Sequence, residues 1–245
     1  ADKSKVDVER VCHLADRFLA EGFTYFDTAA CYHSGNSEQA FREAVAKRYP
    51  REAYTITDKL SLFMLKEASE MPGFFEKQLE NCGVEYFDFY LFHNLCEMNI
   101  DAYLDDEKYG IYTYLKKQKA AGRIRHLGFS AHGSRAVIRR FLEAYGKDME
   151  FCQLQINYLD WTFQSAKEKM DLLAEWNIPI WVMEPLRGGK LADLSAEDTA
   201  RLKALRPNEG IPAWAFRFLQ TLPSVKMILS GMSDLGQVKD NVRTF

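Results

Sequence analysis

Residues 22–33, G-F-T-Y-F-D-T-A-A-C-Y-H, form the stretch on which the fold prediction depends. Its apolar first half is typical of a strand that ends on Asp27, and Tyr32 follows five residues later on a loop. In parallel α/β proteins the ligand site lies beyond the carboxyl ends of the strands, so both residues are candidates for a functional site. The alternative is structural, because an Asp often caps a turn and a Tyr is often partly buried.

Outward from this stretch, helices and strands are predicted to alternate along the chain. Residues 6–20 carry apolar side chains at spacings of three and four, which is typical of an amphipathic helix. Further strands, rich in β-branched and aromatic residues, are expected over residues 54–60, 87–93, 124–130, 151–158, 178–183 and 225–230. Helices are expected over residues 37–48, 68–81, 107–121, 134–144, 164–176, 196–206 and 211–222, with a closing helix from Ser233.

Regular βα units joined by short links predict a parallel sheet with right-handed crossovers. For 245 residues, an α/β fold of the (β/α)8 TIM barrel type is favoured over a doubly wound sheet. Since the pattern gives seven strands, we expect that a first strand before Val6 is missing from the chain, or that the barrel has an open seam. The chain is therefore predicted to be a single barrel domain over residues 1–245, incomplete at its N-terminus and possibly at its C-terminus.

Composition restricts the partners and the compartment of the protein. The net charge is -3 and positive residues are interleaved with negative ones, which argues against a nucleic-acid or anionic-lipid surface. The five cysteines contain no C-x-x-C pair, which argues against disulfides and metal or iron-sulfur sites. No apolar run reaches the roughly 18 residues of a membrane span, so a soluble, cytoplasmic protein is expected. The oligomeric state is left open, as is a removed leader before Ala1.

The strand ends carry a set of polar residues suited to proton transfer. Lys59 and His93 lie at or near the ends of two further strands, and in a barrel they would gather with Asp27 around Tyr32. The Lys59 ammonium would favour tyrosinate and lower the pKa of Tyr32 from about 10, while Asp27 would keep Lys59 charged. His93 would orient a substrate oxygen or relay its proton. A phenol acting as acid implies a substrate oxygen that gains a proton while another group delivers hydride.

A metal site is an alternative for the same strand ends. Asp27, His93, His132 and Glu184 could bind a divalent ion, as in barrel hydrolases. An ammonium at Lys59 would repel such an ion, which makes this metal-dependent hydrolase the less favoured hypothesis.

The motifs F-D-T-A-x-x-Y, T-D-K-L and D-F-Y-L-F-H follow one another in an order that resembles the aldo-keto reductase superfamily, and the resemblance extends over essentially the whole chain. It implies that Asp27, Tyr32, Lys59 and His93 are the catalytic tetrad. The implied reaction is hydride transfer between NADP(H) or NAD(H) and a small-molecule aldehyde or ketone, with Tyr32 as general acid and base. A nicotinamide-binding regulatory or redox-sensing subunit is the alternative within the superfamily.

The resemblance also implies a cofactor site built from G-F-S, Q-I-N-Y, E-P-L-R-G-G and S-G-M-S. In the family the first two segments hold the nicotinamide carboxamide, the third holds the pyrophosphate and the fourth holds the adenosine end. The residues implied to bind the cofactor are Ser130, Gln155, Met183, Pro185, Leu186, Arg187, Gly188, Gly231, Ser233, Gln237 and Asn241.

Two departures from the family pattern concern this cofactor. Met183 stands where many members have a Tyr that stacks on the nicotinamide, and uncharged residues stand where many hold the 2′-phosphate, so the choice between NADP and NAD is left open. The sequence resembles most a bacterial branch that often carries a C-terminal ferredoxin-like extension. The chain ends at Phe245 without those cysteines, so an iron-sulfur cluster is expected only if such an extension exists.

Overall fold

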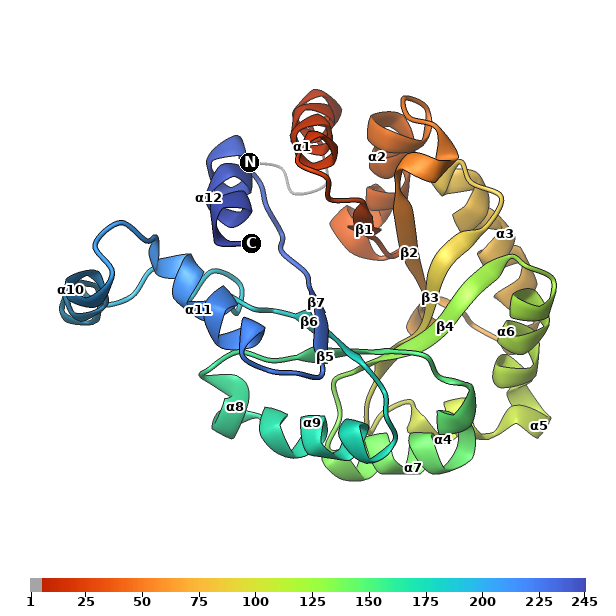
Figure 1. The fold of residues 1–245 in the computed structure, drawn as a ribbon. Coiled ribbons are helices and arrows are strands. Elements are labelled where there is room, and N and C mark those ends of the chain that lie inside the picture. The colour runs from red at the N-terminus through yellow and green to blue at the C-terminus, as the bar shows by residue number, and fades with distance from the viewer. Residues whose placement is uncertain (1–5) are drawn as a thin grey trace. The chain divides into compact units, whose positions relative to one another are not determined.

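The computed structural model describes residues 6–245, in which helices and strands alternate along the chain (Figure 1). The chain divides into two compact units, Ala1–Phe151 and Cys152–Phe245. The first unit contains the strands that carry Asp27, Lys59 and His93, and the second contains the later βα units.

The first unit is built on four parallel strands that neighbour one another in chain order. They are β1 (Tyr25–Asp27), β2 (Thr55–Leu60), β3 (Phe87–Leu95) and β4 (Ile124–Ala131). In the register of this sheet Asp27 pairs with Thr57, and Lys59 pairs with Leu91. Successive parallel strands of this kind are what the βα pattern predicts, and they bring the carboxyl ends of all four strands to one edge.

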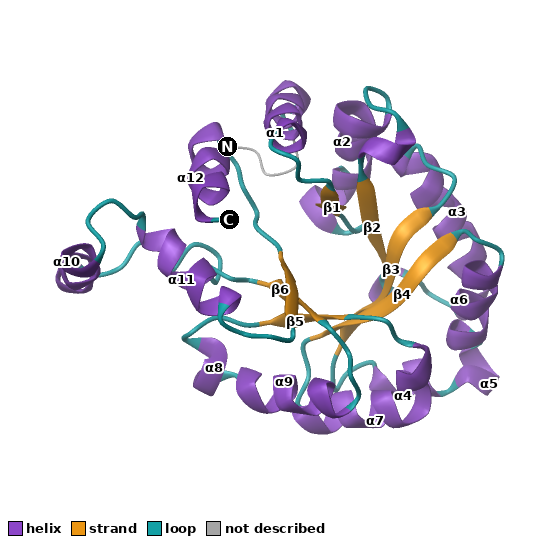
Figure 2. Cartoon of the chain, viewed as in Figure 1, coloured by secondary structure: helices purple, strands orange, loops and turns teal. Residues whose placement is uncertain are grey.

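Helices cover the outer face of these four strands (Figure 2). They are α1 (Val8–Ala20), α2 (Ser37–Phe41), α3 (Met71–Cys82), α4 (Ile100–Leu104), α5 (Asp106–Tyr109), α6 (Ile111–Ala120) and α7 (Arg135–Tyr145). Two predicted helices are interrupted. The helix expected over 37–48 continues from α2 as a π-helical turn, Arg42–Ala46, and the helix expected over 107–121 breaks at Gly110, whose φ of 62° is left-handed.

The core of the first unit is mainly aromatic. Phe92 of β3 packs edge-on against Phe141 of α7, with ring centroids 5.1 Å apart, and both side chains are fully buried. Phe75 of α3 makes a similar contact with Tyr90, at 5.2 Å. Gly128 allows a close approach within this unit, because a Cβ there would lie 2.5 Å from the backbone oxygen of Phe151.

The second unit contains three parallel strands, β5 (Cys152–Gln155), β6 (Ile180–Met183) and β7 (Val225–Ile228), again in chain order. Its helices are α8 (Asp160–Phe163), α9 (Ala166–Glu175), α10 (Ala196–Leu205), α11 (Ile211–Gln220) and α12 (Leu235–Thr244). β5 ends three residues before the predicted boundary. The Asn157 side chain accepts the N–H groups of Leu159 and Asp160, which turns the chain into α8.

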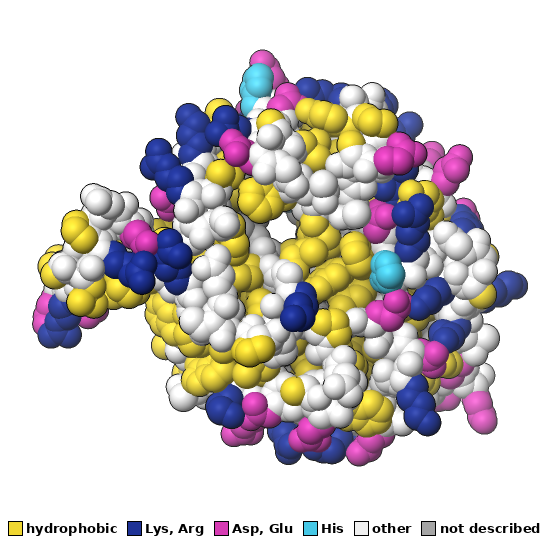
Figure 3. All heavy atoms as spheres, viewed as in Figure 1, with side chains coloured by type: hydrophobic (Ala, Val, Ile, Leu, Met, Phe, Trp, Pro, Cys, Tyr) yellow, Lys and Arg dark blue, Asp and Glu magenta, His cyan; other side chains and the backbone are white. Residues whose placement is uncertain are grey.

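The strand expected before Val6 lies outside the described residues, and residues 6–245 provide seven strands. Within the same range, the structure has no helix with the length and apolar character required to cross a membrane. On the face drawn in Figure 3, Lys and Arg side chains alternate with Asp and Glu and do not gather in one basic patch, as the interleaved charges of the sequence predict.

Candidate active site

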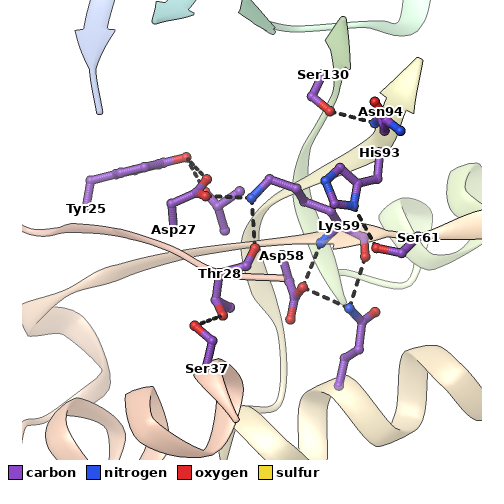
Figure 4. A network of polar contacts seen from close by, with 12 residues as sticks. Tyr25, Asp27, Thr28, Ser37, Asp58, Lys59, Ser61, His93, Asn94 and Ser130 are labelled. Carbon is purple, nitrogen blue, oxygen red and sulfur yellow. Dashed lines mark hydrogen bonds and ion pairs between the residues drawn. The ribbon is translucent and has the colours of Figure 1, made fainter. Parts of the chain in front are cut away.

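A buried ion pair joins the ends of β1 and β2. The Lys59 ammonium donates to Asp27 Oδ1 at 2.5 Å and to the carbonyl oxygen of Thr28 at 2.9 Å (Figure 4). Burial by itself would lower the pKa of Lys59, but Asp27 and Tyr32 outweigh it and raise that pKa above its usual value. Lys59 is 1% exposed and is therefore a buried cation held by a carboxylate.

Two residues that the sequence analysis missed hold Asp27 from the other side. The Tyr25 hydroxyl donates to Asp27 Oδ2 at 3.4 Å, and the Thr57 hydroxyl donates to Tyr25 at 2.5 Å. Tyr25 stands two residues before Asp27, so strand alternation places both side chains on the same face. That alternation is the signal by which Tyr25 could have been predicted.

Tyr32 lies directly beside this ion pair. The Lys59 ammonium is 4.7 Å from the centre of the Tyr32 ring, and the Tyr32 residue is 37% exposed. Desolvation of its buried part raises the pKa of Tyr32, although Lys59 acts to lower it. The expected net lowering of the Tyr32 pKa is therefore wrong, because burial outweighs the ammonium. The phenol stays protonated at neutral pH, in the form that donates a proton.

His93 forms the opposite wall of the cluster. Its ring is edge-on to Tyr32 with centroids 6.2 Å apart, and its Nδ1 lies 2.6 Å from Ser61 Oγ. Burial lowers the pKa of His93 to about 3, and the charges of Lys59 and His132 act in the same direction. The imidazole is therefore neutral near pH 7. This state suits the expected orienting of a substrate oxygen rather than the supply of a proton.

Ser130, the cofactor residue expected on β4, lies in the same unit and is 1% exposed. Its oxygen accepts the N–H of Asn94 at 2.8 Å, as Figure 4 shows. A hydroxyl that accepts one hydrogen bond keeps its own proton for donation. Ser130 can thus donate to a ligand group such as a carboxamide oxygen.

A second buried polar cluster lies on the other face of β2. Asp58 accepts the N–H of Lys59 at 2.7 Å and the amide of Gln78 at 2.8 Å, and Tyr90 donates to Gln78 at 2.5 Å. Burial, together with the nearby Glu38, raises the pKa of Asp58 well above its usual range. Because Asp58 and Lys59 are neighbours on a strand, their side chains point to opposite faces. This cluster supports the Lys59 backbone from outside the site.

In the second unit a buried carboxylate organises two of the expected cofactor residues. Asp160 Oδ2 accepts from the amides of Gln155 at 2.8 Å and Asn157 at 2.7 Å, and Asp160 Oδ1 lies 3.1 Å from Arg187 Nε. Asp160 is fully buried, and such a charge is tolerated because it is paired and hydrogen-bonded. The sequence analysis did not single out Asp160, although it stands five residues after Gln155.

The segment after β6 contains the residues implied to contact the pyrophosphate. Met183 is the last residue of β6 and pairs in register with Gln155. The turn beyond it, which includes Pro185 and Leu186, has left-handed backbone at Arg187 and Gly188, with φ of 49° and 63°. Glycine adopts this conformation without strain, which explains its place in the turn.

The remaining residues of the predicted cofactor site lie in the turn after β7 and in α12. Gln237 Oε1 accepts the N–H of Ser233 at 2.7 Å, and Asn241 donates to Ser230 Oγ at 2.9 Å. These two amides hold the turn around Gly231 against α12. Their observed contacts join α12 to the turn, and their expected contact with an adenosine stays a prediction.

The described residues, 6–245, contain no group of three or more His, Cys, Asp or Glu side chains placed to hold a metal ion. In the first unit, Lys59 rather than a metal ligand lies against Asp27. The five cysteines are free thiols. The arrangement therefore gives no support to the metal-hydrolase alternative.

Three of the four side chains, an ammonium, a carboxylate and a neutral imidazole, lie on parallel strands, and the phenol lies in the 3₁₀ turn after β1. Proteins of this class are equipped to pass a proton to a substrate oxygen. The model of the Aldo/keto reductase family matches residues 2–245, and the chain belongs to this family. Membership confirms the expected (β/α)8 fold class and the expected class of enzyme, an NAD(P)(H)-dependent oxidoreductase.

Solved structures share this fold. Aldo-keto reductase AKR11C1 from Bacillus halodurans, in its holo form, matches with a TM-score of 0.78 and 22% identity, over 99% of this chain and 84% of that one. An aldo-keto reductase from Klebsiella pneumoniae in complex with NADPH matches with a TM-score of 0.77 and 17% identity, over 98% and 81%. These likenesses show the fold. No curated relative matches the chain in sequence.

Proposed function

We propose that the protein interconverts an aldehyde or ketone with the corresponding alcohol, using NADP(H) or NAD(H), and that Tyr32 is its general acid and base. The observation that carries this proposal is the Lys59–Asp27 pair buried against Tyr32, with neutral His93 on the other side. These four side chains supply a proton donor, a charge that stabilises its conjugate base, and a hydrogen-bonding group for the substrate oxygen.

In the direction of reduction, Tyr32 donates its hydroxyl proton to the carbonyl oxygen. A bound reduced nicotinamide supplies the hydride for the carbonyl carbon, so that one hydride and one proton convert the carbonyl into an alcohol. The Lys59 ammonium, 4.7 Å from the Tyr32 ring, stabilises the tyrosinate that forms. Asp27 keeps Lys59 protonated and fixes its position through the 2.5 Å contact.

The chain's own residues offer the groups that a nicotinamide carboxamide requires. Ser130 can donate a hydrogen bond, since its oxygen already accepts from Asn94. Gln155 can accept one at Oε1, since its amide nitrogen is bound to Asp160. A carboxamide has one acceptor oxygen and a donor nitrogen, so each of the two residues offers a group that could bind it. As the family resemblance implies, we propose that Ser130 and Gln155 each contribute to binding the carboxamide.

We also propose NADP(H) rather than NAD(H) as the physiological cofactor. Its support is the Klebsiella pneumoniae relative, whose structure contains NADPH. The uncharged Ser233 and Gln237 provide no bidentate cation for a 2′-phosphate, so any preference should be modest. Titration with NADPH and NADH, followed by nicotinamide fluorescence, decides between the two cofactors.

The expectations about domain organisation, compartment and partners are also proposals. We propose that residues 1–245 belong to a single barrel domain, that the protein acts in the cytoplasm, and that its partner is a small carbonyl compound rather than nucleic acid. The support for the last point is the mixture of charges, 32 Lys and Arg against 35 Asp and Glu.

The Tyr32→Phe variant tests the proposed role of the phenol. Removing the proton donor should reduce turnover of a panel of aldehydes and ketones by about 10²–10⁴-fold, the usual contribution of general acid catalysis. Cofactor binding should be retained, because the ring itself is kept. Tyr109→Phe, which removes a hydroxyl on α5 away from the cluster, is the matched control. Equal rates for wild type and Tyr32→Phe would remove Tyr32 from the mechanism.

A further inference from the structure

Ser61 lies next to the cluster of Asp27, Tyr32, Lys59 and His93, and the proposed mechanism gives it no role. It directly follows the last residue of β2, precedes a 3₁₀ turn, Leu62–Met64, and is fully buried. Buried hydroxyls almost always form hydrogen bonds, because an unpaired one loses its contacts with water. The partner of Ser61 therefore indicates what this side chain does.

That partner is the ring of His93. Ser61 Oγ lies 2.6 Å from His93 Nδ1, and Figure 4 shows this edge of the ring turned toward Ser61. The backbone on either side is fixed as well. The buried Tyr103 hydroxyl donates to the carbonyl oxygens of His93 at 2.7 Å and Leu60 at 3.2 Å, which ties the ends of β3 and β2 together. The Ser61–His93 contact is thus held by the fold on both sides.

A neutral imidazole has one nitrogen that donates and one that accepts, so the partner of one nitrogen determines the state of the other. If Ser61 donates to Nδ1, the proton of His93 is on Nε2, and Nε2 can donate to a carbonyl oxygen. If Nδ1 donates to Ser61, Nε2 is a bare acceptor that would repel a carbonyl oxygen. Only the first arrangement is useful for carbonyl reduction.

The surroundings of Ser61 favour the first arrangement. In the part of the chain that the structure describes, the Cys31 thiol is the other group that interacts with the Ser61 hydroxyl. Sulfur is a weak hydrogen-bond acceptor, whereas imidazole nitrogen is a strong one. The Ser61 proton therefore gains more from His93 than from Cys31. Burial also raises the pKa of Cys31, which keeps its sulfur in the thiol form, a weaker acceptor than a thiolate.

We propose that Ser61 is a positioning residue that donates to His93 Nδ1, keeps the imidazole proton on Nε2, and so aims a hydrogen-bond donor at the substrate carbonyl oxygen. The part of this proposal that concerns substrate rests on the proposed function. The part that concerns the tautomer does not, because it follows from the contacts of Ser61 and His93 alone.

Nitrogen NMR of the imidazole tests the tautomer without any turnover. With ¹⁵N-labelled histidine, wild-type His93 should show a protonated Nε2 and an Nδ1 signal shifted by an accepted hydrogen bond. In Ser61→Ala the Nδ1 signal should move toward the value of a free acceptor. Ser37→Ala, which removes a 2.8 Å hydroxyl contact with Thr28, should leave the His93 signals unchanged. A wild-type proton on Nδ1, or an Nδ1 signal unmoved in Ser61→Ala, would overturn the proposal.

Kinetics test the consequence for catalysis. Ser61→Ala should lower kcat for carbonyl reduction by about tenfold, the rate equivalent of one neutral hydrogen bond, while dinucleotide affinity is unchanged. Ser61→Thr, which retains the hydroxyl, should recover part of that rate and the wild-type Nδ1 signal. An unchanged kcat in Ser61→Ala would show that Ser61 has no positioning role. If wild type itself reduces no carbonyl, the proposed function fails while the NMR result stands.

Discussion

The Lys59–Asp27 pair should contribute strongly to stability as well as to chemistry, and its two members should contribute unequally. Lys59→Met removes the cation and leaves the Asp27 carboxylate, whose side chain is 19% exposed. Asp27→Ala removes the anion and leaves the Lys59 ammonium, whose side chain is 1% exposed, with no carboxylate beside it and with neutral partners such as the Thr28 carbonyl. Asp27→Ala therefore leaves the more deeply buried of the two charges without its partner.

The expected costs follow from this difference in burial. Removing one partner of a buried ion pair costs about 3–5 kcal/mol, because the other charge is left without compensation. Lys59→Met should lie at the lower end of this range, since water reaches Asp27, and Asp27→Ala at the upper end. For a chain of this size these costs correspond to a fall in Tm of about 6–20 °C. The double variant should cost less than the sum of the two, since no charge is left unpaired.

Chemical denaturation of the four proteins, wild type, both single variants and the double variant, measures the coupling. The matched control is the exposed pair Lys77–Glu80 in the same unit, with its atoms 2.8 Å apart and side chains 60% and 66% exposed. Lys77→Met should cost less than about 1 kcal/mol. Additive costs for the Lys59 and Asp27 variants, or single-variant costs no larger than that of Lys77→Met, would refute the reasoning.

Two further predictions concern pH and cofactor binding. Because the pKa of His93 is lowered to about 3 and that of Tyr32 is raised, kcat for reduction should be flat between pH 5 and 8 and fall only above about pH 10. An inflection near pH 6.5 that disappears in His93→Gln would contradict this. Asp160→Asn should weaken dinucleotide binding about tenfold, because Gln155 and Arg187 lose the charge of their shared partner. Unchanged affinity in a fluorescence titration would show that Asp160 does not position them.

The sequence predicts the ends of β1 and β2, because hydrophobic runs and strand alternation are local properties, whereas β3 extends two residues beyond its predicted end at His93. The end of β1 at Asp27 and the positions of Lys59 and His93 follow from such runs. The shorter β5 does not, since its end depends on Asn157, whose side chain competes with the strand by accepting backbone N–H groups. From sequence alone, a polar residue after a strand is equally compatible with a longer strand and with a turn. Only its hydrogen bonds distinguish the two.

The residues that support the site were harder to predict for a similar reason. Ser61 and Asp160 each bind a site residue that belongs to another element, and Tyr25 binds Asp27 within the same strand. Their residue types are common in structural roles, and a hydroxyl or carboxylate in a sequence does not reveal which partner it will meet. Alternation along β1 was a usable signal for Tyr25, whereas the partner of Ser61 comes from a strand 32 residues away.

The protonation state of Tyr32 can be predicted only in part from the types of its neighbouring residues. The sign of each pairwise effect can be predicted, since an ammonium beside a phenol always favours the phenolate. The net shift also contains a desolvation cost, which depends on how much of the ring the folded chain covers, and this cost is the larger one here. Lys59 therefore does not ionise the resting Tyr32. Its ammonium instead lowers the energy of the tyrosinate at the moment when the substrate oxygen takes the proton, which assists reduction while the resting enzyme keeps its acid.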